Sequence, residues 1–414
     1  MKLKLGFICI MLFLVVQSQS YKELTSEQKE YLSKFTYPLK SIEQTTTDNS
    51  DLSVLDKLIG NAKIIGLGEA THGSSEVYKL KYRISEYLIE NKNINVFVLE
   101  ASMPESFLMN QYTIDNQSSA KKLLSGMNFW IWETQESLDF VEWLHDYNST
   151  HSSKVYFDGF DMLYTQGAIA QLKDVYTQNN FHASEIEQLE KALQANNNGQ
   201  RFYSKKDKQL IKELLIPIQK QASKISDTDT KNRFLQNLTI IDQNIELTYL
   251  RRDQFMAQNI KWIANEKPNS KLIVSAHNNH ISKSGSDKMG HWLAQDFGSD
   301  YINFGFAFYE GHYSASINGD VVSYLGETAF PGTLEYTLNS LNIPVFILDL
   351  KSIKQENNPL AKWLMKNILF RKTGSGLTKD KSEFESIDVT NAFDYLIFIN
   401  KSTSSNLLVN ASKK

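Results

Sequence analysis

The sequence contains one cysteine, Cys9, among 414 residues. Cys9 lies in an N-terminal stretch that we expect to be removed, so the mature chain would have no disulfide, no thiolate nucleophile and no cysteine-based metal site. An excess of basic residues is lacking as well. Without its first twenty residues the chain loses two lysines, which leaves 42 basic against 47 acidic residues and a formal charge of −5. This balance argues against a nucleic-acid partner, because such binding depends on clustered basic side chains.

The first twenty residues predict a targeting segment. Lys2 and Lys4 precede an apolar run from Leu5 to Val16, and small polar residues follow it. This order is typical of a cleavable secretory signal peptide over residues 1–20, and the run is short for a membrane span. A retained membrane anchor is the alternative interpretation. We therefore expect a secreted or periplasmic protein with no membrane attachment after signal removal.

Three motifs for common reaction types are missing. The sequence has no Gly-x-Ser-x-Gly nucleophile elbow, no Gly-x-x-x-x-Gly-Lys phosphate loop and no His-Glu-x-x-His zinc-protease pattern. With no signal for a serine or cysteine nucleophile, activated water is the simplest nucleophile that remains.

Short apolar, β-branched runs alternate with helical patterns along most of the chain. This alternation predicts an α/β fold with a mostly parallel sheet flanked by helices. The predicted strands cover residues 63–67, 95–99, 154–157, 271–275, 301–308, 344–348 and 395–399. Residues 21–60 have a helical pattern.

One section departs from the alternation. From about residue 166 to 262 we find no convincing strand, only long amphipathic segments. We expect an inserted helical subdomain or lid at 166–250, between a first α/β half at 21–165 and a second at 251–414. A helical layer flanking the sheet is the alternative.

Acidic residues and histidines follow the predicted strands. Glu69 and His72 come in the glycine turn after the strand at 63–67, and Glu100, Asp161 and His277 come at the ends of three others. Because parallel neighbours end at one edge of a sheet, these side chains should converge there. A carboxylate can orient an imidazole, which then takes a proton from water. Taken singly, Glu100 and Asp161 could also be helix caps.

A metal site is a competing interpretation of the same residues. Glu69-x-x-His72 and His277-x-x-His280 have spacings that metals use, and such ligands suit zinc or iron. A bound metal is therefore not excluded, although we predict no cofactor. An iron, haem or other ligand-binding protein, or a metal-dependent hydrolase, remains the alternative to a metal-free enzyme.

Several motifs resemble those of the erythromycin esterase family, in the family's order and over nearly all of the mature chain. They are Gly68-Glu-Ala-Thr-His-Gly73, Glu76 with Leu80-Lys81 and Arg83, Val98-Leu-Glu-Ala101, Gly159-Phe-Asp-Met162, Arg252-Asp-Gln-Phe-Met256-Ala-Gln-Asn259, Ala276-His-Asn-Asn-His280 and Phe393-Asp-Tyr-Leu-Ile-Phe398.

The resemblance implies a hydrolase that opens a carboxylic ester or lactone by attack of water. His72 matches the general base, Glu69 and Glu100 match its acidic partners, and His277 is expected to stabilise the oxyanion. The remaining matching positions are expected to bind the small-molecule substrate; they are Glu76, Lys81, Arg83, Asp161 and His280. The best-known members act on macrolides, and some of these carry arginine where this chain has Lys81, which lacks the bidentate fork of arginine.

Overall fold

The computed structural model describes residues 23–44, 48–115, 118–194, 203–267, 269–376 and 382–408. The expected signal peptide at residues 1–20 lies outside these ranges. Within them, no helix combines the length and apolar character that crossing a membrane would require.

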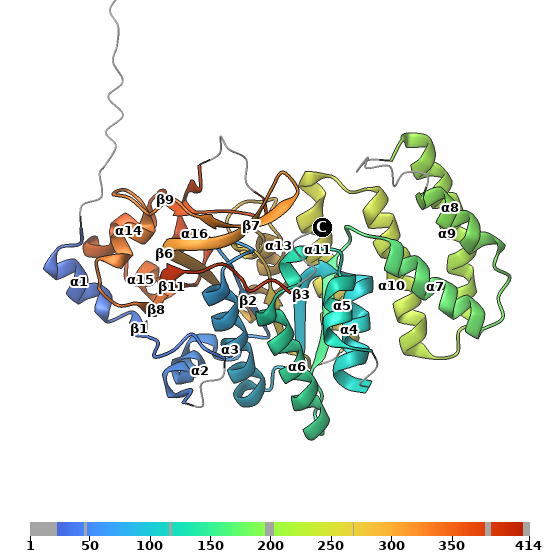
Figure 1. Ribbon diagram of the computed structural model, residues 1–414, viewed down its shortest axis with the longest axis horizontal. Coiled ribbons are helices and arrows are strands. Elements are labelled where there is room, and N and C mark those ends of the chain that lie inside the picture. The colour runs from blue at the N-terminus through green and yellow to red at the C-terminus, as the bar shows by residue number, and fades with distance from the viewer. Residues whose placement is uncertain are drawn as a thin grey trace, which may run out of the picture.

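A nine-stranded sheet forms the centre of the molecule (Figure 1). Six neighbouring strands are parallel, and the other three are antiparallel to their neighbours. The spatial order is β1 (Thr36–Pro38), β8 (Val345–Asp349), β11 (Tyr395–Ser402), β6 (Tyr301–Ile317), β2 (Ile64–Leu67), β5 (Leu272–Ser275), β3 (Val96–Ser102) and β4 (Tyr156–Asp161), with β7 (Asp320–Leu325) paired to β6. The predicted fold class, a mostly parallel sheet with flanking helices, is confirmed.

Helices cover both faces of the sheet, because successive strand residues point to opposite sides. On β2, for example, Ile64 and Ile65 belong to different hydrophobic cores. The Ile65 face is covered by α2 (Val54–Ile59), α3 (Ser75–Lys92), α5 (Ala120–Gly126) and α6 (Gln135–Thr150). The Ile64 face is covered by α1 (Ser26–Ser33), α11 (Tyr249–Glu266), α13 (Met289–Phe297), α14 (Leu334–Asn339), α15 (Leu350–Glu356) and α16 (Val389–Ala392).

A block of helices extends from the β4 end of the sheet, next to α4 (Met103–Asp115) (Figure 1). It contains α7 (Gln166–Gln178), α8 (Ser184–Gln194), α9 (Lys205–Gln221) and α10 (Thr228–Ile245). These helices enclose a hydrophobic core of their own, which includes Leu172, Leu189 and Ile241. No strand occurs in the described part of residues 166–262, as the sequence predicts.

The helical prediction for residues 21–60 is wrong at Thr36–Pro38. These residues form β1, which pairs with β8 through main-chain hydrogen bonds at the sheet edge. Such pairing depends on a strand some 310 positions away in the chain, so local pattern gave no sign of it. β7 was also not predicted.

The turn after β2 lies directly against β6. Ser314 N and Ser405 N both donate to the Gly73 carbonyl oxygen at 2.8 Å. A Cβ atom at Gly73 would lie 1.9 Å from the Ser314 carbonyl oxygen. Only glycine therefore allows this approach, which fixes the position of the preceding residue, His72.

We expect Gly73→Ala to lower the free energy of unfolding by about 3 kcal/mol, because the added methyl group must displace the β6 main chain. Gly126→Ala is the control, since a Cβ at Gly126 in α5 meets no atom within 4 Å. It should be neutral or slightly stabilising. Urea denaturation of both variants measures the difference, and equal effects would contradict the predicted clash.

Candidate active site

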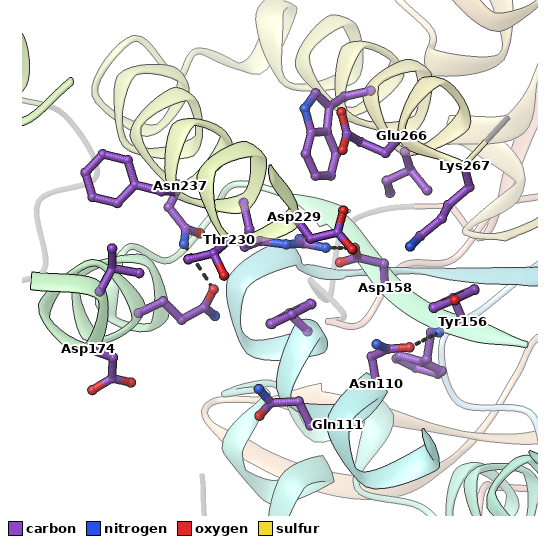
Figure 2. A pocket seen from close by; sticks show the side chains of 18 of the residues that line it. Asn110, Gln111, Tyr156, Asp158, Asp174, Asp229, Thr230, Asn237, Glu266 and Lys267 are labelled. Atoms are coloured by element: carbon purple, nitrogen blue, oxygen red, sulfur yellow. Dashed lines mark hydrogen bonds and ion pairs between the residues drawn. The ribbon is translucent and has the colours of Figure 1, made fainter. Parts of the chain in front are cut away.

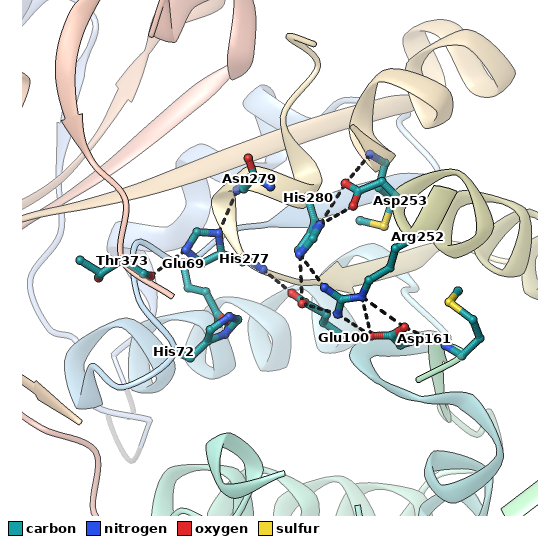
Figure 3. A network of polar contacts seen from close by, with 12 residues as sticks. Glu69, His72, Glu100, Asp161, Arg252, Asp253, His277, Asn279, His280 and Thr373 are labelled. Carbon is teal, nitrogen blue, oxygen red and sulfur yellow. Dashed lines mark hydrogen bonds and ion pairs between the residues drawn. The ribbon is translucent and has the colours of Figure 1, made fainter. Parts of the chain in front are cut away.

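The ends of four neighbouring parallel strands carry the side chains that the sequence predicts to meet. β2, β5, β3 and β4 lie side by side in that order. Glu69 and His72 follow β2, His277 follows β5, and Glu100 and Asp161 lie in the last residues of β3 and β4. Figure 3 shows these five residues in one polar network. The structure therefore brings together residues that are up to 208 positions apart in the sequence.

His72 is bound to a buried ion pair. Its Nδ1 lies 2.6 Å from Glu69 Oε1, and Lys81 Nζ lies 2.6 Å from Glu69 Oε2. Burial raises the pKa of Glu69, but the Lys81 charge and the His72 contact outweigh this effect and lower the pKa to about 2. An ionised carboxylate only accepts hydrogen bonds, so a neutral His72 ring carries its proton on Nδ1 and keeps a lone pair on Nε2.

His277 lies beside His72, with ring centroids 5.0 Å apart. Its Nε2 is 2.9 Å from the Thr373 carbonyl oxygen, and its Nδ1 accepts from Asn279 N at 3.1 Å. Burial, together with the nearby His72, lowers the pKa of His277 to about 3. His277 is thus neutral, and its single ring N–H is used by Thr373. This differs from the expected oxyanion role, which needs an N–H that faces the reacting oxygen.

Glu100 is a buried carboxylate with three donors around it. The His277 amide donates to Oε2 at 2.9 Å, while His280 Nε2 and Arg252 Nη2 each lie 3.2 Å from Oε1. Burial raises the pKa of Glu100, but the charges of His280, His72 and Arg252 hold it well below its usual range. Glu100 is therefore ionised at neutral pH.

Two residues of α11 complete the network and were not among the predicted site residues. Arg252 Nη2 lies 2.5 Å from Asp161 Oδ2, and Asp253 Oδ2 lies 2.9 Å from His280 Nδ1. Both occur in the motif that begins at Arg252, and this motif was the signal that could have identified them. The strand-end pattern does not predict them, because they lie on a helix, α11, and not at the end of a strand.

Three residues expected to bind substrate lie elsewhere. Arg83 forms a buried ion pair with Asp51, with Nη2 and Oδ1 2.6 Å apart. Glu76 accepts from Thr403 N and Oγ1 at 2.5 and 2.7 Å. Lys81 is 1% exposed; its ammonium group binds Glu69 and lies over the Tyr78 ring. None of the three lines the cavity beside His72. Asp161 does not line it either, because its buried carboxylate is held by Arg252. The prediction that these four side chains contact a substrate there is therefore wrong.

A cavity of about 680 Å³ opens beside His72. One wall carries the polar network. The other includes residues 372–376 and 382–385, from the hairpin of β9 (Ile368–Arg371) and β10 (Phe384–Ile387). Its apolar lining comprises Phe129, Leu163, Leu247, Tyr249 and Phe384. In the aromatic stretch 129–132 only Phe129 reaches the cavity, since Trp130 and Trp132 are in the core.

The side chains of Glu69, His72 and Glu100 each offer a ligand atom, and these atoms lie within 4.8 Å of one another. The surroundings do not suit a metal ion, however. Both oxygens of Glu69 are already engaged, one by His72 and the other by the Lys81 ammonium group. A cation bound there would meet that ammonium charge, which disfavours a metal ion at this position.

A second cavity, of about 390 Å³, lies where β4 meets α4, α7, α10 and α11 (Figure 2). Its Arg233 guanidinium group lies over the rings of Phe107 and Trp262 and 2.7 Å from Asp158 Oδ2. None of the predicted site residues lines this cavity. The candidate chemistry is therefore confined to the cavity beside His72.

Comparison with known proteins identifies relatives over most of the chain. The model of the family described as "Erythromycin esterase" matches residues 89–402. "Putative hydrolase YbfO" of Bacillus subtilis is 23% identical over 78% of this chain and 81% of its own length. "Erythromycin esterase type II" of Escherichia coli is also 23% identical, over 64% of this chain and 73% of its own.

Solved structures share the fold. A Bacillus cereus protein superposes with a TM-score of 0.81 at 25% identity, covering 92% of this chain and 98% of its own. A mutant of the erythromycin esterase EreC in its open conformation superposes with a TM-score of 0.68 at 16% identity. That match covers 89% of this chain and 98% of EreC.

The low pKa of Glu69 predicts an acid-sensitive fold. The pKa of Glu69 falls from 4.5 to about 2 on folding. The ionised carboxylate therefore contributes fully to the free energy of unfolding above pH 4.5, and this contribution is lost as the pH falls toward 2. Between these pH values the unmodified protein should lose roughly 3 kcal/mol more stability than Glu69→Gln.

Urea denaturation at pH 5 and pH 2.5 measures this loss. Glu142→Gln, which replaces an exposed glutamate of α6, should lose as much stability as the unmodified protein. If Glu69→Gln loses as much stability between these pH values as the unmodified protein, Glu69 is not the source of the acid sensitivity.

Proposed function

The chain belongs to the erythromycin esterase family, and from this premise we propose that it hydrolyses a carboxylic ester or lactone with water activated by His72. The observation that carries the proposal is the contact of His72 with the buried, ionised Glu69. This contact leaves Nε2 of a residue that lines the cavity with a lone pair for a water proton.

In the proposed reaction, His72 Nε2 removes a proton from water as the oxygen attacks the carbonyl carbon. The tetrahedral intermediate then collapses, the bond to the ester oxygen breaks, and His72 returns the proton to the leaving alkoxide. The products are a carboxylic acid and an alcohol, or one hydroxy acid from a lactone. Glu69 holds the ring and stabilises the imidazolium that forms, while Lys81 keeps Glu69 ionised.

Arg252 is the better-placed group for the developing oxyanion. Its side chain is 25% exposed and lines the cavity, while Asp161 and Glu100 hold its guanidinium group. His277 would first have to release Thr373 before its N–H could turn to the substrate. We therefore assign the oxyanion to Arg252 and give His277 a role in shaping the cavity wall.

The substrate that we propose is an ester or lactone with an apolar body. The apolar lining of the cavity supports this, and its volume admits substrates as large as a macrolide ring. We further infer that the helical block at residues 166–250 is an insertion leading to the cavity wall at Leu247, and that the basic, apolar start of the chain directs export to the periplasm or the exterior.

Replacement of His72 tests the base. We expect His72→Ala to lower kcat about 10²- to 10⁴-fold, because a positioned general base contributes that much. The measurement is hydrolysis of a panel of simple esters, lactones and macrolides. His182→Ala, which removes an exposed histidine of the helical block, should retain full activity. Full activity of His72→Ala on a substrate of the unmodified protein would refute the mechanism.

Metal removal separates the proposed enzyme from its alternatives. With His72 as the base and Lys81 beside Glu69, activity should survive dialysis against a chelator, and the purified protein should contain no stoichiometric metal. Elemental analysis, an absorbance spectrum and the same hydrolysis assay measure this. Chelator-sensitive activity would indicate a metal-dependent hydrolase, and bound haem without hydrolysis would indicate a ligand-binding protein.

A further inference from the structure

His280 lies between two carboxylates. Its Nδ1 is 2.9 and 3.0 Å from the two oxygens of Asp253, and its Nε2 is 3.2 Å from Glu100 Oε1 (Figure 3). Ionised carboxylates only accept hydrogen bonds, so all these carboxylate contacts are satisfied when both ring nitrogens carry protons. Arg252 Nη1, which can only donate, lies farther from Nε2, at 3.4 Å. The contacts therefore favour the imidazolium form of His280, with no ring N–H left for a substrate.

Asp253 does not reach the cavity itself. It is 6% exposed, and its second contact is with Met289 N at the start of α13, which donates to Oδ2 at 2.9 Å. α11 and α13 thus fix this carboxylate from two sides. The cavity-lining side chain that the Asp253 carboxylate contacts is His280.

We propose that Asp253 is a positioning residue: its carboxylate keeps His280 charged, and the charged ring holds Glu100 beside the catalytic base. This inference rests on the function proposed above. Glu100 also accepts the His277 amide at 2.9 Å, so Glu100 helps to hold the turn after β5, together with the main-chain bonds from Ala276 N and Asn278 N. Asp253 would thereby fix the position of the cavity wall formed by Glu100 and the turn after β5, without touching the substrate.

The charges around His280 favour its protonated form. It faces Glu100 on β3, Asp253 and Arg252 on α11, and the neutral His277 ring, with Lys288 beyond Asp253 at the start of α13. Burial lowers the pKa of His280, but the charges of Glu100 and Asp253 outweigh this effect and raise the pKa to about 9. The ring should therefore lose its proton only in alkaline solution.

Asp253→Asn tests the proposal because it removes the charge and keeps the shape. The asparagine oxygen can still accept from a neutral His280 at Nδ1, but Nε2 then presents a lone pair to Glu100 instead of a proton. We expect kcat at pH 8 to fall about 10- to 100-fold with little change in KM. The loss should shrink as the pH falls toward 6, where His280 is protonated again.

The pH dependence distinguishes a charge effect from damage to the fold. In the unmodified protein the alkaline limb of kcat/KM should lie near the point where NMR shows His280 losing its proton, and in Asp253→Asn both should move to lower pH. Asp296→Asn on α13, whose partner is the exposed Lys261, is the control and should move neither. A loss of activity that is the same at every pH would overturn the proposal.

NMR alone decides the question if no substrate is found or if Asp253→Asn does not fold. In the unmodified protein His280 should remain protonated to about pH 9, and the His277 amide signal, which reports on Glu100, should shift as His280 titrates. Loss of the His280 proton near pH 6.5, the ordinary pKa of a histidine, would overturn the proposal. Absence of hydrolysis in the unmodified protein would instead refute the proposed function and leave this result standing.

Discussion

Charge compensation of buried carboxylates is the interaction on which the rest of the site depends. Glu69 and Glu100 enter the sheet edge from β2 and β3, and neither is more than 6% exposed. A buried carboxylate without a partner would take up a proton and lose its function. Lys81 supplies the cation for Glu69, and Arg252 with His280 supplies it for Glu100. These pairs keep both acids ionised beside His72, the proposed base.

Replacing such a whole pair by apolar side chains would change stability little, because the cost of removing two charges from water cancels most of their attraction, whereas losing one partner, as when Glu69 is protonated, is costly. The value of these pairs lies in preorganisation. A base held by a fixed carboxylate needs no solvent reorganisation when its charge changes. The cost of orienting the polar groups around it has already been met by folding. The close approach of Gly73 to Ser314 serves the same end, since it fixes the chain one residue after the base.

The parts of the site that lie at strand ends could be predicted from the residue pattern, whereas the two residues on α11 were marked only by the motif that begins at Arg252. Glu100 and His277 each end a buried β-branched run, and parallel neighbours must end at the same edge. Arg252 and Asp253 stand on α11, where a charged pair at the start of an amphipathic helix is typical of a solvated surface. Only the packing of α11 against β4 turns them inward, and the helical pattern does not reveal that packing.

The residues misassigned on α3 show why helical geometry limits such predictions. Lys81 and Arg83 are two positions apart, which places them about 200° apart around the helix axis. When Lys81 points to Glu69, Arg83 must therefore point away, and it reaches Asp51 instead. A cluster of matching charges along one helix thus supplies a single residue to the site. That residue, Lys81, contacts Glu69 and does not line the cavity, so in the proposed mechanism a lysine is sufficient where direct substrate binding would favour the fork of arginine.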